Sequence, residues 1–243
     1  MIDIHSHILR NFDDGPKTLD NSIALIKESS AQGIRKFAST SHYYSSHMPL
    51  DEFLNRRERR IKELRDELAV RQIGVEIVAG AEVHLTEVLF NLSDISGLCY
   101  EGTNYILIEI PHSEKSFDGP LHMIERLTSY YNVKPVIAHI ERYSYLYKND
   151  ANLAKLRSLG CLFQIDAEVL LASSFFKKRA IMRLIREGKV DFVASDCHGD
   201  TRQQNLEAAF EVIEKKFGST TCERFKNTPY MMLDNVSPDD IIL

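Results

Sequence analysis

The chain has 243 residues, of which 44% are hydrophobic and 27% are charged, a balance typical of a folded protein and not of a disordered one. Its net charge of -5 provides no basic excess for gripping a nucleic acid backbone, so we expect no nucleic acid partner. The first residues, Met-Ile-Asp-Ile-His, show no basic region followed by an apolar one, and no stretch approaches the roughly 18 apolar residues that a membrane span requires. We therefore expect a cytoplasmic protein that does not insert into membranes.

Seven short segments rich in β-branched residues recur along the chain, and each has the length of a strand. The segments between them are longer; 18–32 carries apolar residues at helical spacing, and 51–71 is heavily charged. Glycines such as Gly33 and Gly160 lie where these helices should end. The expected strands are 1–4, 35–40, 75–79, 105–110, 133–138, 161–165 and 190–194.

The alternation of strands and helices predicts an α/β fold built on a parallel sheet. No Pro-rich or Ser-rich linker divides the chain, so we expect a single domain over residues 1–243. The sheet should be closed, or nearly closed, into a barrel. An open doubly wound sheet is the structural alternative.

Ionisable residues gather at the carboxyl ends of the expected strands. Loops leaving these ends converge over one edge of a parallel sheet, so side chains distant in sequence should meet there. The candidates are His5 and His7 at the first strand, His42 at the second, Glu82 at the third, Glu109 at the fourth, His139 at the fifth, and Asp196 and His198 at the seventh.

These side chains form a ligand set of imidazoles and carboxylates, which suits manganese, iron or zinc. The set contains no thiolate, which disfavours a structural zinc site. Five imidazoles and three carboxylates exceed what one ion can use, so the number of ligands indicates two or three ions. Asp14, in the sequence Phe-Asp-Asp-Gly, is a candidate ninth ligand.

The remaining histidines show no partner pattern, and we interpret them as surface or packing residues. Asp166 ends the sixth expected strand, where it could bind a metal or cap the following helix. The histidines interpreted in this way are His47, His84, His112 and His122.

Two arginines, Arg142 and Arg202, follow candidate ligands by a few residues. A guanidinium group matches phosphate oxygens bidentately. Arginines beside a metal cluster therefore indicate phosphoryl chemistry, with Arg142 and Arg202 as catalytic and substrate-binding residues.

Other nucleophiles lack support in the sequence. Cysteine-dependent tyrosine phosphatases place a thiolate and an arginine at the ends of a phosphate-cradling loop, and the spacing from Cys197 to Arg202 is one residue too short. The cysteines form no CxxC pair, and neither a G-x-S-x-G elbow nor a P-loop is present. Water activated by metal ions then suffices, with no covalent enzyme intermediate.

The chain resembles the bacterial PHP-type protein tyrosine phosphatases, a branch of the polymerase and histidinol phosphatase superfamily. The resemblance extends from Met1 to about Arg202 with motifs in the same order and at similar spacing. The motifs are Met-Ile-Asp-Ile-His-Ser-His, Asp-Asp-Gly-Pro, Ser-Thr-Ser-His, Gly-Ala-Glu, Ile-Glu, Ala-His-Ile-Glu-Arg and Ala-Ser-Asp-Cys-His.

The resemblance implies a distorted seven-stranded (β/α) barrel of the PHP type that holds three metal ions, usually Mn²⁺, with Fe or Zn as alternatives. It implies that Asp14 joins the eight ligands above and that Arg142 and Arg202 hold the phosphoryl group. It also implies a partner, the phosphotyrosine tail of a bacterial tyrosine autokinase that controls capsule or exopolysaccharide synthesis.

Three other functions remain open from the sequence. A metal site does not select the leaving group, so a small-molecule phosphatase, for example one acting on histidinol phosphate, is the main alternative. A metal-dependent nuclease is disfavoured by the acidic balance of the chain. A non-catalytic metal-binding regulator is disfavoured because arginines accompany a full ligand set.

Overall fold

The computed structural model describes residues 1–199 and 204–242, so Arg202 lies outside the described residues. Strands in the described ranges pair in parallel throughout and form two sheets. The smaller sheet has the order β1 (Ile2–Ser6), β2 (Lys36–Ser39), β4 (Glu76–Ala79). The larger sheet has the order β3 (His42–Tyr43), β5 (Glu82–His84), β6 (Tyr105–Glu109), β7 (Lys134–Ile137), β8 (Leu162–Asp166), β9 (Phe192–Ala194).

The parallel α/β fold expected from the sequence is confirmed, and each expected strand is present within a few residues of its predicted bounds. Closure into one seven-stranded barrel is not confirmed, because the strands divide between two sheets. The division arises where the chain interrupts two strands. Residues 40–41 separate β2 from β3, and residues 80–81 separate β4 from β5.

The first strand also contacts the segment that follows the last one. The His7 N–H donates to the Cys197 carbonyl at 3.0 Å, and the Asp196 N–H donates to the His5 carbonyl at 2.9 Å. A parallel bridge joins Ser6 to Cys197. The two ends of the strand order therefore meet at the level of the candidate ligands.

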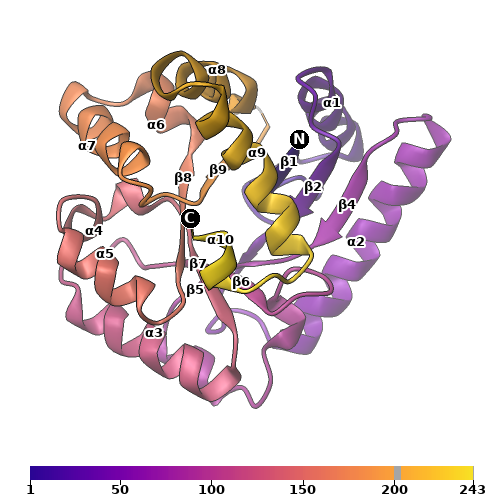
Figure 1. The fold of residues 1–243 in the computed structure, drawn as a ribbon. Helices are drawn as coiled ribbons and strands as arrows, with labels where there is room; N and C mark the ends of the chain where they lie inside the picture. Colours follow the sequence, from indigo (N-terminus) through magenta and orange to yellow (C-terminus); the bar gives the residue numbers. More distant parts are fainter. Residues whose placement is uncertain (200–203, 243) are drawn as a thin grey trace.

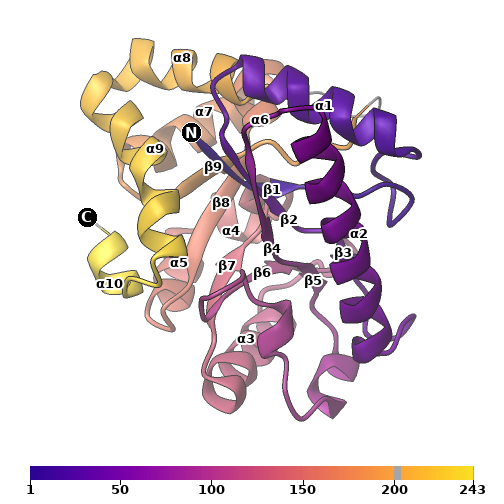
Figure 2. The same ribbon diagram turned by 90° about the vertical axis from the view of Figure 1, so that its right-hand side faces the viewer.

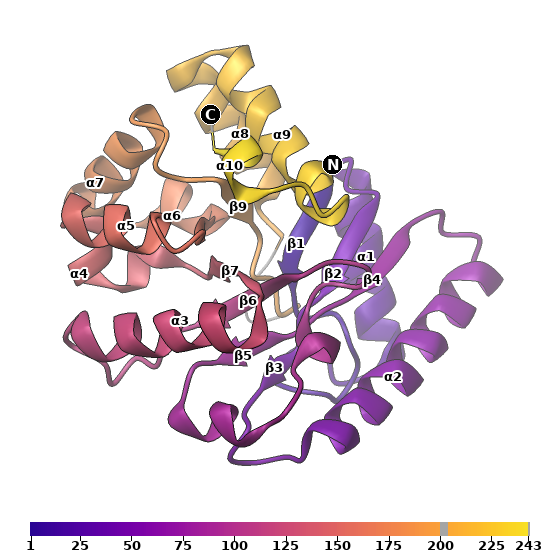
Figure 3. The ribbon, with the colours of Figure 1, turned by 60° about the horizontal axis from the view of Figure 1, so that its bottom comes forward.

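Helices surround the strands (Figures 1 and 3). The predicted helices 18–32 and 51–71 are confirmed as α1 (Leu19–Ala31) and α2 (Leu50–Val70), which cover one side of the molecule (Figure 2). The Thr18 side chain caps α1 by accepting from the Asn21 N–H. The others are α3 (Asp118–Tyr131), α4 (Ser144–Tyr147), α5 (Asp150–Arg157), α6 (Ala167–Ala172), α7 (Phe175–Arg186), α8 (Leu206–Phe217), α9 (Ser219–Leu233), α10 (Pro238–Ile241) and the 3₁₀ helices η1 (Glu87–Asn91), η2 (Ser96–Leu98) and η3 (Ile140–Arg142).

The larger apolar core cluster includes residues of α1 and α2. A smaller apolar cluster consists mainly of strand residues. It includes Ile4, Leu107 and Phe192, together with Met232 of α9 and Ile241 of α10. Figure 1 shows α10 near the centre of the view, over the strands. Because the inside of the strand array is packed with apolar side chains, the polar candidate residues have a rigid floor beneath them.

No helix in residues 1–199 or 204–242 combines the length and the apolar character needed to cross a bilayer.

Candidate metal centre

An irregularity in β1 brings the first two histidines into the centre. The register of β1 against β2 shifts between Asp3 and Ser6. Ile4 packs in the inner apolar cluster, while His5, the next residue, points its Nε2 atom at acidic side chains. Local slips of this kind re-aim side chains and recur next to active sites.

Strand register places two further pairs directly side by side. His42 of β3 is the partner of Glu82 in β5, and His84 of β5 is the partner of Glu109 in β6. His42 and Glu82 begin short strands that follow an interruption, whereas the sequence placed them at strand ends. The Cβ atoms of cross-strand neighbours lie close together. The strands that follow the interruptions therefore place these side chains next to one another.

The last candidates come from loops with unusual backbone geometry. His139 follows β7 with a φ of 35°, and Asp196 follows β9 with a φ of 50°. Non-glycine residues adopt this left-handed region at an energetic cost, and such residues cluster at functional sites. The bend at Asp196 presents both Asp196 and His198 to the centre.

Glu82 lies at the centre of the cluster and is buried, with a relative exposure of 1%. Its Oε2 atom lies 3.3 Å from Nε2 of His5, 3.3 Å from Nε2 of His7 and 2.9 Å from Nδ1 of His42. Its Oε1 atom lies 2.8 Å from Nε2 of His139. One carboxylate thus faces four imidazoles.

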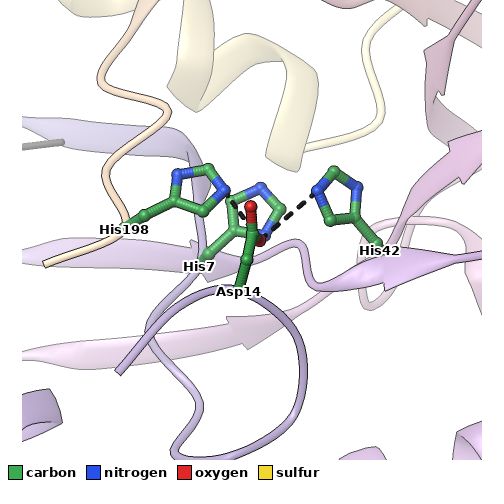
Figure 4. Close-up of side chains that lie close together, drawn as sticks. All are labelled: His7, Asp14, His42 and His198. Carbon is green, nitrogen blue, oxygen red and sulfur yellow. Dashed lines mark ion pairs between the residues drawn. The ribbon is translucent and has the colours of Figure 1, made fainter. Parts of the chain in front are cut away.

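Asp14 connects a second set of imidazoles on the outer side (Figure 4). Its Oδ1 atom lies 3.1 Å from Nε2 of His198 and 3.6 Å from Nε2 of His42. The loop that carries Asp14 packs closely on the first histidines: a Cβ atom at Gly15 would lie 2.5 Å from the His7 carbonyl oxygen. Glycine is therefore required where the loop crosses the strand end.

The candidate ligands form three overlapping groups in which donor atoms lie within 4.8 Å of one another. His7, His42 and Glu82 are each shared between two groups. His139 extends the group that contains Glu109, since its Nε2 atom also lies 3.7 Å from Oε1 of Glu109. The groups are His5, His7, Glu82 and Asp196; His42, Glu82 and Glu109; and His7, Asp14, His42 and His198.

In four imidazoles Nδ1 faces a protein oxygen to which an Nδ1–H group can donate, an arrangement that would leave Nε2 for a metal ion. The Nδ1 atom of His7 lies 2.9 Å from Oδ2 of Asp13. For the other three, the Nδ1 acceptors are Oε1 of Gln164 at 3.3 Å from His5, the hydroxyl of Tyr143 at 3.3 Å from His139, and the carbonyl of Asp196 at 2.8 Å from His198.

The residues present fit a cluster of divalent cations. Three buried ligand atoms at the centre, Nδ1 of His42, Oε2 of Glu82 and Nε2 of His198, lie close to charged partners but meet no described residue in hydrogen-bond geometry. Buried polar atoms in proteins are almost always paired, so atoms left in this state point to a ligand. Imidazole nitrogens and carboxylate oxygens are the donors that manganese, iron and zinc accept.

The electrostatics also favour positive charge at the centre. Burial lowers the pKa of His5, but the charges of Glu82 and Asp196 outweigh burial and raise that pKa to about 9. Burial raises the pKa of Glu82, but His5 and its neighbouring imidazoles hold that pKa well below its ordinary value. Cations placed among these carboxylates would supply the positive charge that the imidazolium groups otherwise provide.

Arg142, the other predicted functional residue in the described ranges, stands at the edge of this cluster. Its Nη2 atom lies 2.9 Å from Oδ2 of Asp166 and 2.5 Å from Oδ2 of Asp196. Its side chain remains 22% exposed, so it can reach a bound ligand. The charges of the carboxylates around it outweigh burial and raise the Arg142 pKa, so the guanidinium group stays charged.

Sequence reasoning missed the residues that orient the ligands: Asp13, Gln164 and Tyr143. Their roles depend on contacts between distant segments, and no local pattern marks Gln164 or Tyr143. Asp13 had a signal, since it adjoins Asp14 in a loop already singled out.

Two sequence interpretations need correction. His84, interpreted as a surface or packing residue, lies 3.2 Å from Oε2 of Glu109 through its Nδ1 atom. The spacing Glu82-Val-His84 was a signal, because alternate residues of a strand share a face. Asp166 makes no side-chain cap on α6; it binds Arg142 and accepts from the Gln164 amide at 3.0 Å.

The family model described as "Capsular polysaccharide synthesis, CpsB/CapC" matches residues 1–233. The tyrosine-protein phosphatase CpsB of Streptococcus pneumoniae is 36% identical in an alignment that covers 94% of this chain and 96% of the relative. The tyrosine-protein phosphatase YwqE of Bacillus subtilis (strain 168) is 33% identical, with coverage of 97% and 89%.

Solved structures agree with these relatives. A structure from work on YwqE of Bacillus subtilis and CpsB of Streptococcus pneumoniae, described as unique metal-dependent tyrosine phosphatases, has a TM-score of 0.85 and 28% identity and covers 98% of this chain and 96% of that one. A putative histidinol phosphatase of Listeria monocytogenes, at TM-score 0.53 and 10% identity over 83% of this chain and 96% of that one, shares the fold. The resemblance predicted from the motifs is confirmed, and the chain belongs to the CpsB/CapC family of capsular polysaccharide synthesis proteins.

Proposed function

We propose that this chain is a metal-dependent protein-tyrosine phosphatase. The observation that carries the proposal is the packing of three overlapping ligand groups beside Arg142, in a chain whose relatives are named tyrosine-protein phosphatases. The ligands are His5, His7, Asp14, His42, Glu82, Glu109, His139, Asp196 and His198.

The three ligand groups would hold three ions, one for each group, and Mn²⁺ is the first choice, with Fe or Zn as alternatives. When bound, such ions act as Lewis acids on phosphoryl oxygens and lower the pKa of water to near neutrality. Glu82 holds two groups together because both of its oxygens face imidazoles. The strand array corresponds to a distorted seven-stranded barrel if each interrupted pair, β2 with β3 and β4 with β5, is taken as one strand.

Arg142 binds the phosphoryl oxygens and neutralises the charge that they develop in the transition state. Ion pairs with Asp166 and Asp196 hold its guanidinium group in place. Arg202 joins Arg142 in this role as a further proposal from the sequence. The leaving group is a tyrosine phenolate; its pKa of about 10 makes it a far better leaving group than an alkoxide, so expulsion makes little demand on a general acid.

Cys197 takes no part in the reaction. Its side chain is fully buried, and burial raises the pKa of its thiol above the ordinary value. A buried thiol of raised pKa carries no thiolate at neutral pH and makes a poor nucleophile.

The substrate is the phosphotyrosine tail of a bacterial tyrosine autokinase that regulates capsular or exopolysaccharide synthesis, and the enzyme works in the cytoplasm. The family description, capsular polysaccharide synthesis, supports this assignment.

The test is a comparison of substrates across metals. Protein treated with a chelator should hydrolyse neither p-nitrophenyl phosphate nor a phosphotyrosine peptide, and added Mn²⁺ should restore both activities. Histidinol phosphate and a phosphoserine peptide should be poor substrates under the same conditions. Faster turnover of histidinol phosphate than of the phosphotyrosine peptide would replace the proposal with a small-molecule phosphatase.

A further inference from the structure

The helix α7 carries a cationic surface that the metal centre does not use. Its sequence from 175 to 186, Phe-Phe-Lys-Lys-Arg-Ala-Ile-Met-Arg-Leu-Ile-Arg, contains five basic residues and no acidic one. The chain as a whole has a net charge of -5, so this concentration is local. Apolar residues such as Ile181 and Leu184 are buried, which leaves the basic residues for the outer side.

Two adjacent aromatic side chains begin this helix and remain in solvent. Phe175 is 72% exposed and Phe176 is 81% exposed, and their rings pack edge to face with centroids 5.7 Å apart. Adjacent exposed aromatics of this size are unfavourable in water and mark contact surfaces.

The aromatic pair and the basic residues line one surface cavity of about 710 Å³, which we call the α7 cavity. None of the described residues that line it is acidic. Its lining includes Phe175, Phe176, Lys178, Arg179 and Arg186 of α7 and Lys216 of α8.

Lys177 connects the α7 cavity to the metal centre. It lies between Phe176 and Lys178 in sequence, and it lines two smaller cavities, of about 370 and 350 Å³, that also contain Arg142 and His112. The lining of these two cavities is mixed in charge, since it also includes Lys115 and the acidic residues Glu114, Glu141, Asp166 and Glu168. The concentrated positive charge begins at Lys177 and continues along α7. Figure 1 shows α7 on the outside of the molecule, beside α4 and α6.

We propose that the α7 cavity and Lys177 dock an acidic segment that adjoins the phosphotyrosine of the protein substrate. The inference rests on the proposed function and names the substrate class that the site prefers. The basic residues pair with the anionic groups of the segment, and Phe175 and Phe176 cover its apolar atoms.

The anionic groups can be carboxylates or a second phosphotyrosine, because both offer the same charged oxygens. A flat anionic membrane fits less well, since the basic residues line a concave surface. A single extended segment can occupy the cavity while its phosphotyrosine lies at Arg142.

Binding can be measured apart from catalysis with labelled peptides and chelator-treated protein, by fluorescence anisotropy. The peptides carry one phosphotyrosine followed by four Glu, four Gln or four Lys residues, or by a second phosphotyrosine among Gln residues. The Glu peptide should bind about tenfold more tightly than the Gln peptide, and high salt should reduce the difference. The peptide with two phosphotyrosines shows which anionic group is preferred.

Two double variants test the surface, Lys178→Glu with Arg179→Glu, and Phe175→Ser with Phe176→Ser. The first should abolish the preference for Glu over Gln, and the second should weaken all peptides. Matched controls are Lys62→Glu, an exposed lysine of α2, and Tyr130→Ser, a 67% exposed aromatic near the end of α3. Neither control should change binding. Turnover of p-nitrophenyl phosphate by the Mn²⁺-loaded variants shows that the metal centre is intact.

Equal affinity of the wild-type protein for the Glu and Gln peptides would overturn the docking proposal. Co-sedimentation with vesicles of phosphatidylglycerol and phosphatidylcholine tests for membrane binding. If the Lys178→Glu, Arg179→Glu variant loses a co-sedimentation that the wild-type protein shows, while its peptide binding is unchanged, the docking proposal is overturned in favour of a membrane surface. Failure of the proposed function looks different: the Glu preference in binding would persist while no phosphotyrosine peptide is hydrolysed with any metal.

Discussion

The Nη2 atom of Arg142 lies 2.5 Å from Oδ2 of Asp196, so the proposed phosphate-binding arginine is joined directly to a candidate metal ligand. Asp166 holds the same nitrogen from its other side at 2.9 Å. The carboxylate that would bind a metal therefore also positions the guanidinium group. Phosphate recognition and metal binding are parts of one hydrogen-bonded unit.

Replacing Arg142 with lysine should lower kcat/KM for p-nitrophenyl phosphate by about 100-fold. The lysine ammonium group is a point charge, so it cannot contact the phosphate bidentately and also keep the contacts with Asp166 and Asp196. The metal content should stay at the wild-type level, which elemental analysis checks. Near-normal kcat/KM in Arg142→Lys would mean that Arg142 does not touch the phosphoryl group.

Replacing Glu82 with glutamine should remove metal from the protein, because Glu82 faces four imidazoles and belongs to two ligand groups. We expect at least one ion fewer per chain by elemental analysis, and activity reduced by about 100-fold or more. Glu76→Gln, in the exposed first residue of β4, is the matched control and should keep its metals. Full metal content in Glu82→Gln would contradict the ligand assignment.

Replacing Asp13 with asparagine should weaken metal binding without removing a ligand. Asp13 accepts from Nδ1 of His7, and loss of such an outer partner costs about 10- to 100-fold in metal affinity. Titration of the chelator-treated protein with Mn²⁺, followed by activity, measures the shift. Asp66→Asn, on the exposed side of α2, should leave the titration unchanged; a shift as large as that of Asp13→Asn would show that the effect is not local.

Replacing Cys197 with serine should preserve most of the activity of the Mn²⁺-loaded protein, because the buried thiol of raised pKa is not the nucleophile. The assay is kcat with p-nitrophenyl phosphate, alongside thermal unfolding to detect any structural damage. Abolished turnover in a folded, metal-loaded Cys197→Ser protein would favour a thiolate mechanism instead.

Much of the fold was predictable because both faces of its central strands are buried. β6 and β8 are buried at every position, so they appear in the sequence as short continuous runs of mainly apolar residues. The splitting of two strands into β2 with β3 and β4 with β5 was not predictable. It depends on how residues 40–41 and 80–81 fit against neighbouring segments, such as Thr40 and Tyr100 around Gly80.

The candidate ligands were predictable from the sequence because imidazole and carboxylate donors recur near strand ends, and parallel strands bring their carboxyl ends to one edge. The nine candidate ligands, the parallel α/β fold and the family motifs could be identified from the sequence alone.

Only the tertiary structure decided which of these side chains lie close together and which contacts orient them. Asp13, Gln164 and Tyr143 hold the Nδ1 atoms of His7, His5 and His139. Asp166 became a partner of Arg142, and α7 came to lie beside the centre through Lys177. Donor chemistry belongs to the residue type and can be seen in sequence, whereas these roles belong to contacts between segments that only folding brings together.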